Sequence, residues 1–399
     1  MPVKTEIRLT LGNIAGIAIS IKMKRRNFLN FMASSAAIVE SGNLAGFRMQ
    51  SRLETNKSTP KISRTQGWFM PDEADPHKNT WMAFGAKAEI WGKKSLRSIQ
   101  ENIALIARTI ARYEPVILLV RPQEQSLAAK LCGASVKLQV CPLDDIWIRD
   151  TGPVFLLNLQ GEVAGIDFNF NGWGNKQEHT NDAKVARRVA ELASAELINT
   201  SIVAEGGGIE VDGQGTAIIT ESCILNSNRN PGLRKNECER QLKDLLGLQK
   251  IIWLPGIKGK DITDGHTDFY ARFTRPGVVA AGLELDSESF DYDVTREHLK
   301  ILNAATDAKG RKLEVVTLEA PSKIRSNYSS ENFAAGYINF YVVNGAVIAP
   351  EFGDSKADAN ARVILGKLFP GRQVVQLNID GIASGGGGIH CVTLQQPHK

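Results

Sequence analysis

From about residue 68 onward, the chain alternates short apolar runs with polar turns that carry glycine. The runs are rich in β-branched and aromatic residues, which is typical of strands. A β-rich run, a glycine turn and a second β-rich run recur at residues 152–165, 209–220, 268–281 and 338–349. The turn glycines, at positions 161, 215, 277 and 345, are 54, 62 and 68 residues apart. This pattern predicts four β-hairpins.

Segments with apolar positions at helical spacing lie between these hairpins or beside them. They cover residues 95–113, 182–197, 236–246, 295–308 and 356–369. A unit of hairpin plus helix, repeated four or five times, predicts a closed, radially arranged α/β body in which one end of every hairpin lies near a common axis. Because the repeat length is irregular, a series of α/β units without such symmetry is the alternative.

The positive charge of the chain is concentrated at its N-terminus. The formal net charge is +5, but residues 1–60 hold nine Lys and Arg against three Glu, so the remaining residues carry a net charge of −1. A phosphate-tracking surface needs a basic patch on the folded body. We therefore expect no nucleic-acid partner.

Residues 1–66 have the features of an export signal followed by a flexible linker. Arg25 and Arg26 precede a short, mildly apolar run, an order that fits a twin-arginine signal. This predicts a periplasmic location, and a basic tail on a cytoplasmic protein is the alternative. The run is too short to span a bilayer, so we expect no membrane partner. Residues 67–399 are predicted to form a single domain.

Five cysteines occur without regular spacing, and Cys391 has the most unusual surroundings. No CxxC pair indicates structural zinc, and a domain of this size needs no disulfides. The run of four glycines at 385–388 comes shortly before Cys391. Glycines permit close backbone approach at an entropic cost. They favour a reactive thiol at the start of a short strand, with backbone cleared around it; an inert buried cysteine is the alternative.

Three further segments carry candidate chemistry. His266 and Asp268 are two positions apart, so on an extended segment they share a face, where the carboxylate raises the imidazole pKa. His390 would point to the other face from Cys391, which makes it a poor base. Asp150 precedes a predicted strand, and Glu205 precedes three glycines. The alternatives are a surface His–Asp pair, an ion pair of Arg149 with a neighbouring Asp, and a solvated turn Glu.

These candidates all fall at the starts of successive hairpins, so a radial arrangement would bring their side chains together. Three carboxylates, a histidine and a cysteine without metal-ligand spacing suit a planar guanidinium, whose N–H fork pairs with carboxylates. Its central carbon is electrophilic and open to attack by a thiolate. We therefore expect a small cationic guanidino substrate.

Specific stretches of the chain resemble the agmatine deiminase family. They are residues 144–155, 205–231, 265–269, 339–354 and 385–396. That family belongs to the guanidine-modifying enzymes with the pentein fold, a five-bladed α/β propeller of hairpin-plus-helix units around a pseudo-fivefold axis, and it is grouped with bacterial peptidylarginine deiminases. The resemblance extends over almost all of the chain from about residue 67 and makes residues 67–399 a single deiminase domain.

The resemblance implies roles for six residues. Cys391 would be the nucleophile and His266 the general acid/base. The guanidinium would be held by Asp150, Glu205 and Asp268, with Trp147 against the substrate chain. The implied reaction converts agmatine to N-carbamoylputrescine and ammonia through an amidino-cysteine intermediate, a step of putrescine biosynthesis, without a metal or organic cofactor. A homo-oligomer is a possible assembly.

Three departures from the family pattern are expected to contact the tail of the substrate. The family commonly has Asn at position 388, His at 210 and Trp-Pro at 84–85, where this chain has Gly388, Glu210 and Phe84-Gly85. Deimination of free or peptidyl arginine, or amidino transfer to an amine, is the alternative on the same fold. Two other classes are a metal-dependent hydrolase with His266, Asp268, Cys391 and Asp150 as ligands, and a non-catalytic binding or export protein.

Overall fold

A computed structural model describes residues 7–10, 20–23, 67–328 and 332–398, and the chain divides into two compact units, Met1–Thr59 and Pro60–Lys399. In the first unit, β1 (Ile7–Thr10) and β2 (Ser20–Met23) pair antiparallel. The expected twin-arginine signal and the expected linker lie outside the described residues. None of the described helices is long and apolar enough to cross a membrane.

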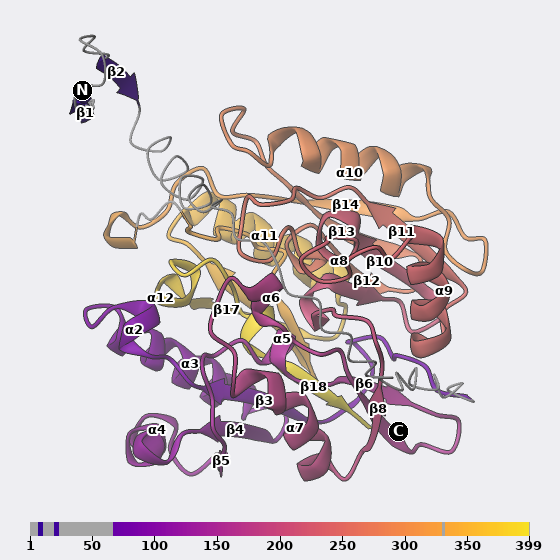
Figure 1. Ribbon diagram of the computed structural model, residues 1–399, viewed down its shortest axis with the longest axis horizontal. Coiled ribbons are helices and arrows are strands. Elements are labelled where there is room, and N and C mark those ends of the chain that lie inside the picture. The colour runs from indigo at the N-terminus through magenta and orange to yellow at the C-terminus, as the bar shows by residue number, and fades with distance from the viewer. Residues whose placement is uncertain (1–6, 11–19, 24–66, 329–331, 399) are drawn as a thin grey trace, which may run out of the picture. The chain divides into compact units, whose positions relative to one another are not determined.

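The second unit repeats one sheet topology, which Figure 1 lets the reader follow along the chain. In each repeat, an antiparallel hairpin is followed by a helix and then by a third strand that pairs parallel to the second. Four sheets have three strands each: β6-β7-β8, β9-β10-β11, β12-β13-β14 and β15-β16-β17. The parallel third strands do not appear in the predicted pattern, because each pairs only after a helical crossover.

The four predicted hairpins are confirmed. They are β6 (Val154–Leu157) with β7 (Val163–Asp167), β9 (Ile209–Val211) with β10 (Thr216–Thr220), β12 (Ala271–Arg275) with β13 (Val278–Leu283), and β15 (Tyr341–Val343) with β16 (Ala346–Glu351). All four turn glycines have positive φ, between 82° and 97°. A side chain at these positions would be strained, which is why glycine marks the turns.

The predicted helices also form, each followed by a parallel strand. They are α7 (Val185–Ala193), α9 (Lys235–Leu246), α10 (Tyr292–Ala304) and α11 (Ser355–Leu368), which lead to β8 (Glu196–Asn199), β11 (Lys250–Leu254), β14 (Glu314–Glu319) and β17 (Gln373–Asn378). The segment 182–197, predicted to be helical throughout, therefore ends in a strand.

A fifth sheet joins the two ends of the second unit. The C-terminal strand β18 (Leu394–Pro397) pairs antiparallel with β3 (His77–Phe84), which continues in parallel to β4 (Val116–Val120) and β5 (Val136–Val140). Helices α3 (Leu96–Ile110) and α4 (Gln125–Cys132) connect these parallel strands. The strand predicted to start at Cys391 does form, but it begins three residues later. Residues 390–392 form a 3₁₀ turn, and β18 begins at Leu394.

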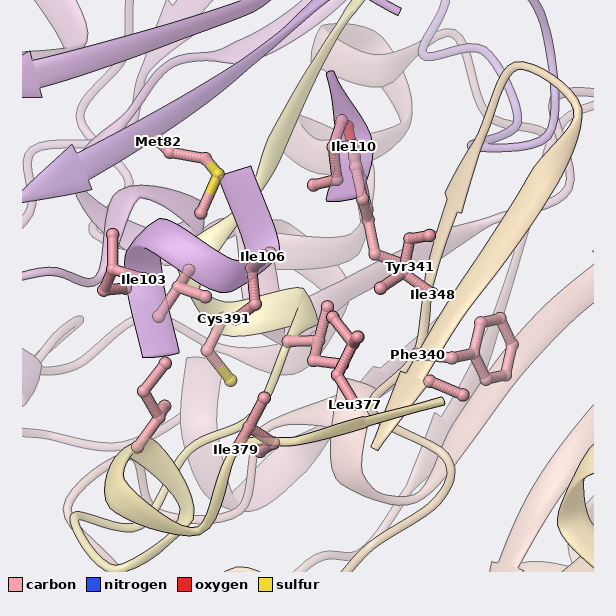
Figure 2. Close-up of a cluster of buried hydrophobic side chains, with 14 of the residues drawn as sticks. Met82, Ile103, Ile106, Ile110, Phe340, Tyr341, Ile348, Leu377, Ile379 and Cys391 are labelled. Carbon is pink, nitrogen blue, oxygen red and sulfur yellow. The ribbon is translucent and has the colours of Figure 1, made fainter. Parts of the chain in front are cut away.

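The largest apolar cluster packs α3 against β3, β4 and the β15–β16 hairpin. Figure 2 shows its members, among them Ile103, Ile106 and Ile110 from α3, with Cys391 beside them. Helix α3 contributes one apolar face to this cluster, as its 3.6-residue spacing requires. The same packing that builds the core thus fixes the segment that carries the candidate nucleophile.

Short helical turns between these elements carry most of the polar side chains discussed below. They are α2 (Ala88–Trp91), α5 (Ile148–Thr151), α6 (Gly172–Asn175), α8 (Glu221–Ile224), α12 (Asp380–Ala383) and the 3₁₀ turns η4 (Gly206–Gly208), η5 (Thr267–Phe269) and η7 (His390–Val392).

Candidate active site

A cavity of about 440 Å³ lies where several of these turns meet. Its lining includes Trp91, Asp145, Trp147, Asp150, Trp173, Gln177, His266, Phe269, Gly385, Gly386, Gly387 and Cys391. Four of the six predicted site residues therefore line one cavity. The other two, Glu205 and Asp268, lie directly behind this lining and contact it.

Cys391 lies on η7 with its thiol almost fully buried, at 7% exposure. Its Sγ is 3.4 Å from Nδ2 of Asn339 and 3.6 Å from Oδ2 of Asp268. Burial raises the pKa of the Cys391 thiol well above its ordinary range, and the charges of Asp268 and Asp150 add to the effect. The thiol is therefore protonated when the cavity holds no cation.

His266 is in contact with two carboxylates on opposite sides of its ring. Its Nδ1 is 3.7 Å from Oδ1 of Asp150, and its Nε2 is 3.3 Å from Oε2 of Glu205. Burial alone would lower the imidazole pKa, but the charge of Asp150 and hydrogen bonds with Cys223 and Glu205 outweigh it and raise the pKa well above the usual value. His266 is thus a protonated acid at neutral pH.

Asp150 is held in place from two directions. Its Oδ1 accepts a hydrogen bond of 3.1 Å from the Gly207 amide, and its Oδ2 accepts one of 3.0 Å from the Trp173 indole. Trp173 has φ 55° and ψ 43°, the left-handed region that a bulky residue rarely adopts. Such strain is typical of positions where a side chain must be aimed, here at Asp150.

Glu205 and Asp268 make different use of their oxygens. Arg229 Nε donates to both oxygens of Glu205, at 2.8 and 3.0 Å, and burial of the pair is complete. Asp268 accepts from His390 Nδ1 through Oδ2 at 2.7 Å, whereas its buried Oδ1 has no partner among the described residues. An unpaired buried carboxylate oxygen is costly, so Asp268 Oδ1 is poised to accept a donor from a ligand.

Gly207 marks the point at which three predicted side chains converge. A Cβ added there would lie 2.7 Å from His266 Nδ1, 2.9 Å from Asp150 Oδ1 and 3.2 Å from Asp268 Oδ2. No side chain fits at this distance, so glycine is required for these groups to share one space. His266 and Asp268 meet here although the predicted extended segment is wrong, since residues 267–269 form the η5 turn.

The alternatives of a surface His–Asp pair, a solvated turn Glu and an ion pair of Arg149 with a neighbouring Asp are wrong. His266, Asp268 and Glu205 are each at most 2% exposed, so none is a solvated surface group. Arg149 pairs with Glu73 rather than with Asp144 or Asp145.

Three of the four glycines at 385–388 make room for neighbouring side chains rather than for the sulfur of Cys391. A Cβ at Gly385 would lie 2.2 Å from the Trp91 ring, one at Gly387 2.2 Å from the Trp147 ring, and one at Gly388 2.3 Å from Oδ1 of Asn339. Gly386 has φ +91°. The expectation of cleared space around the nucleophile is corrected accordingly: the space is filled by two indoles and an amide.

Trp147 and Trp91 form an aromatic wall of the cavity, with ring centroids 5.7 Å apart. Both indole N–H groups donate to Asp145, at 3.1 and 2.7 Å. Burial raises the pKa of Asp145 to about 6 despite these donors. Asp145 therefore orients the predicted substrate-chain residue Trp147 and its partner.

Sequence reasoning missed several residues that complete the site: Trp91, Asp145, Cys223, Arg229, Asn339 and the pair Glu73–His390. His390 bridges Asp268 and Glu73 through its two ring nitrogens, at 2.7 and 2.9 Å. The Asp-Asp-x-Trp motif offered a signal for Asp145. Asn339 lies 52 residues before Cys391 in the chain, and no local pattern links the two.

Comparison with known proteins places this site in context. The family model for Porphyromonas-type peptidyl-arginine deiminase matches residues 69–397. The chain is 38% identical over 363 residues to the agmatine deiminase of Pseudomonas aeruginosa, covering 85% of this chain and 97% of that protein. It is 37% identical over 369 residues to the agmatine deiminase of Stutzerimonas stutzeri, covering 86% and 99%. A solved agmatine deiminase of Enterococcus faecalis superposes with TM-score 0.79 at 32% identity, covering 84% and 97%.

Proposed function

The chain belongs to the Porphyromonas-type peptidyl-arginine deiminase family, and from this we propose that it is an agmatine deiminase, which hydrolyses agmatine to N-carbamoylputrescine and ammonia. One observation carries the proposal. The Cys391 thiol, the His266 imidazole and the Asp150 carboxylate line one cavity, and directly behind them Asp268 has a buried carboxylate oxygen that no described residue bonds. The relatives named agmatine deiminases supply the substrate.

The fold supports this assignment. We take the five sheets of Pro60–Lys399 as the five blades of the pentein propeller. The four three-stranded sheets have the hairpin–helix–parallel strand order, and in the fifth sheet the pair β18–β3 stands in place of a hairpin and joins the two ends of this unit. We infer that this closure sets the starts of successive hairpins around one axis, next to the site residues.

The positive guanidinium of the substrate is attracted to the carboxylates of the site. The guanidinium donates N–H bonds to Asp150 and to Oδ1 of Asp268, which no described residue bonds, while Trp147 flanks the alkyl chain. Glu205, predicted as a third holder of the guanidinium, already accepts from Arg229 through both oxygens and acts through His266 instead.

The positive charge of the guanidinium beside Cys391 counteracts Asp150 and Asp268, whose charges keep the thiol pKa high. The thiol then loses its proton to solvent, and the substrate itself generates the nucleophile.

The chemistry proceeds in two halves. The Cys391 thiolate attacks the central carbon, forming an S–C bond and a tetrahedral adduct. Protonated His266 gives its proton to one nitrogen, the C–N bond breaks and ammonia leaves, which produces an amidino-cysteine. Neutral His266 then takes a proton from water as the hydroxide adds to the same carbon. The S–C bond breaks as the adduct's hydroxyl gives its proton to solvent, and the neutral ureido product departs with the thiolate and protonated His266 regenerated.

The test incubates the purified full chain with agmatine, free arginine or a blocked arginine peptide and measures ammonia and ureido product by mass spectrometry. We expect turnover of agmatine, lost at least about 1,000-fold in Cys391→Ala and kept in the matched control Cys132→Ala, a buried thiol of α4. Turnover of arginine or the peptide instead of agmatine would replace this function with a citrulline-forming one. No ureido product from any substrate would overturn the deiminase assignment.

A further inference from the structure

A second buried thiol, that of Cys223, lies outside the cavity lining and plays no part in the mechanism above. Cys223, on α8, donates to Oε2 of Glu205 at 3.4 Å, and the same oxygen is 3.3 Å from Nε2 of His266. The Oε2, Sγ and imidazole nitrogen atoms all lie within 4.8 Å of one another. Three ligand types thus meet around one small space.

The spacing matches a tetrahedral transition-metal site. With bonds of about 2.0–2.3 Å to zinc, two ligand atoms of a tetrahedron are roughly 3.3–3.7 Å apart. The measured separations of 3.3 and 3.4 Å fall in this range. Thiolate, imidazole and carboxylate are also the ligands that zinc takes, whereas calcium and magnesium prefer oxygen alone.

The surrounding side chains support the ligands as they do in known metal centres. When a histidine binds a metal through Nε2, its Nδ1–H usually points to a carboxylate. Here Asp150 Oδ1 lies 3.7 Å from Nδ1. Arg229 fixes the Glu205 carboxylate through both oxygens. Both ligating side chains are therefore already oriented without the ion.

The surrounding carboxylates also permit the ion despite the neighbouring arginine. Arg229 pairs with Asp264 through Nη1 and with Glu205 through Nε, each at 2.8 Å, and Asp150 lies 3.7 Å from His266. These negative charges offset the guanidinium beside a divalent ion, so the ion would not be an unpaired buried charge.

We propose that Glu205, Cys223 and His266 form an inhibitory site for a zinc-class divalent ion. An ion bound to Nε2 keeps His266 from carrying the proton that the leaving nitrogen needs, so the loaded enzyme does not complete deimination. The site is reached from the cavity, because His266 lines it. It shares only His266 with the hydrolytic metal set considered from the sequence, and it lacks Cys391. The inhibitory role rests on the proposed function, but the binding site does not.

The deciding experiment reads metal binding without activity. Co²⁺ is added to Cys391→Ala protein, and the near-ultraviolet thiolate-to-cobalt band is titrated. We expect one equivalent to produce the band, its loss in Cys391→Ala/Cys223→Ser and its retention in the control Cys391→Ala/Cys141→Ser. A band that survives the Cys223 change, or no band in Cys391→Ala, overturns the site.

Two further measurements close the remaining gaps. X-ray absorption of zinc-loaded Cys391→Ala needs no change at Cys223 and should show one sulfur at ~2.3 Å with nitrogen or oxygen neighbours; zero sulfur overturns the proposal.

In wild-type protein, zinc should inhibit deimination. Cys223→Ser should raise the half-inhibitory zinc concentration at least about 10-fold over that of wild type, with each protein measured against its own uninhibited rate. An unchanged value would overturn the inhibitory role. Absence of any deimination would count against the proposed function alone, since the cobalt and absorption readouts stand apart from it.

Discussion

At the scale of single residues, the protonation of Cys391 depends on the charges of the neighbouring side chains. Its thiol is buried beside Asp268 and Asp150, and both carboxylates oppose a second negative charge. The pKa of His266 is raised as well, because the ring lies between the carboxylates of Asp150 and Glu205, but for an imidazole this favours the charged form. The free protein therefore holds the thiol and the imidazolium, and a cationic substrate is what changes the balance.

The pH dependence of catalysis should show this coupling. A raised thiol pKa means that thiolate, and hence rate, appears only as pH rises, so the acidic limb of kcat/KM lies in the alkaline range. In the substrate complex the guanidinium lowers the Cys391 pKa, so the limb of kcat should lie at lower pH. Initial rates with agmatine from about pH 6 to about pH 10 measure both limbs.

The control replaces the carboxylate of Asp268 with a neutral amide of nearly the same shape. Asp268→Asn removes the charge that faces Sγ at 3.6 Å, so the iodoacetamide reaction of Cys391 in free protein should begin at lower pH than in wild type. This readout requires no turnover. Coincident limbs for kcat and kcat/KM in wild type would contradict the substrate-induced shift.

At the scale of elements, the segment from α12 to η7 is shaped by what it packs against. Gly385, Gly387 and Gly388 leave no room for a Cβ, because Trp91, Trp147 and Asn339 occupy that space at 2.2 to 2.3 Å. Asp145 holds the two indoles through their N–H groups. The glycine run 385–388, which the sequence alone would leave flexible, thus packs tightly against the Trp91–Trp147 wall. This packing sets the position of Cys391.

Gly387→Ala should disturb this wall. The new methyl would lie 2.2 Å from the Trp147 ring, so the ring must move, and overpacking of this kind costs about 1–3 kcal/mol. We expect a lower free energy of unfolding in urea and a KM for agmatine raised roughly 10-fold, corresponding to ~1.4 kcal/mol of lost binding.

Gly366→Ala is the matched control, because its nearest neighbour, Val374 Cγ2, is 4.0 Å away and the position lies in α11. There the methyl should stabilise the helix by ~0.5–1 kcal/mol and leave KM unchanged. A wild-type KM in Gly387→Ala would show that Trp147 does not position the substrate.

At the scale of the whole Pro60–Lys399 unit, Glu73 joins distant parts of the chain beneath the site. Its carboxylate accepts from Arg272 at 2.8 Å, His390 at 2.9 Å, the Val342 amide at 2.9 Å and Arg149 at 3.1 Å. These donors come from β12, η7, β15 and α5. Through His390, Glu73 also positions Asp268.

Glu73→Gln should destabilise the fold by about 3–5 kcal/mol, because it leaves the buried Arg149 guanidinium without its counter-charge and takes from Arg272 one of its two carboxylate partners, the other being Glu210. Burial alone would raise the Glu73 pKa, but Arg272 and His390 outweigh it and hold the pKa well below its usual value of 4.5. The stabilisation is therefore complete above about pH 4.5 and lost as pH falls further. Urea unfolding at pH 7 and at pH 4 should show a smaller difference from wild type at the lower pH.

Glu101→Gln is the control for this change, since its ion pair with Arg97 is about half exposed, at 53% for both side chains. Its effect should stay below about 1 kcal/mol. Equal effects of the two substitutions would refute the role of Glu73 as the link between these elements.

The sequence by itself determined the local elements and the chemical types at the site. Turn glycines and alternating runs predict the four hairpins, because strand alternation and positive φ depend on neighbouring residues alone. The order of Asp150, Glu205, His266, Asp268 and Cys391 along the chain was enough to indicate a guanidinium site.

Only the tertiary structure decided which side chains meet. The pairing of β18 with β3, the fit of Gly387 to Trp147, the approach of Asn339 to Cys391 and the contact of Cys223 with Glu205 and His266 join segments with no shared local pattern. Each of these contacts depends on how the sheets pack. The same packing buries the side chains, and burial then raises or lowers their pKa values. Such effects arise from the sum of many distant neighbours, so no short stretch of sequence specifies them.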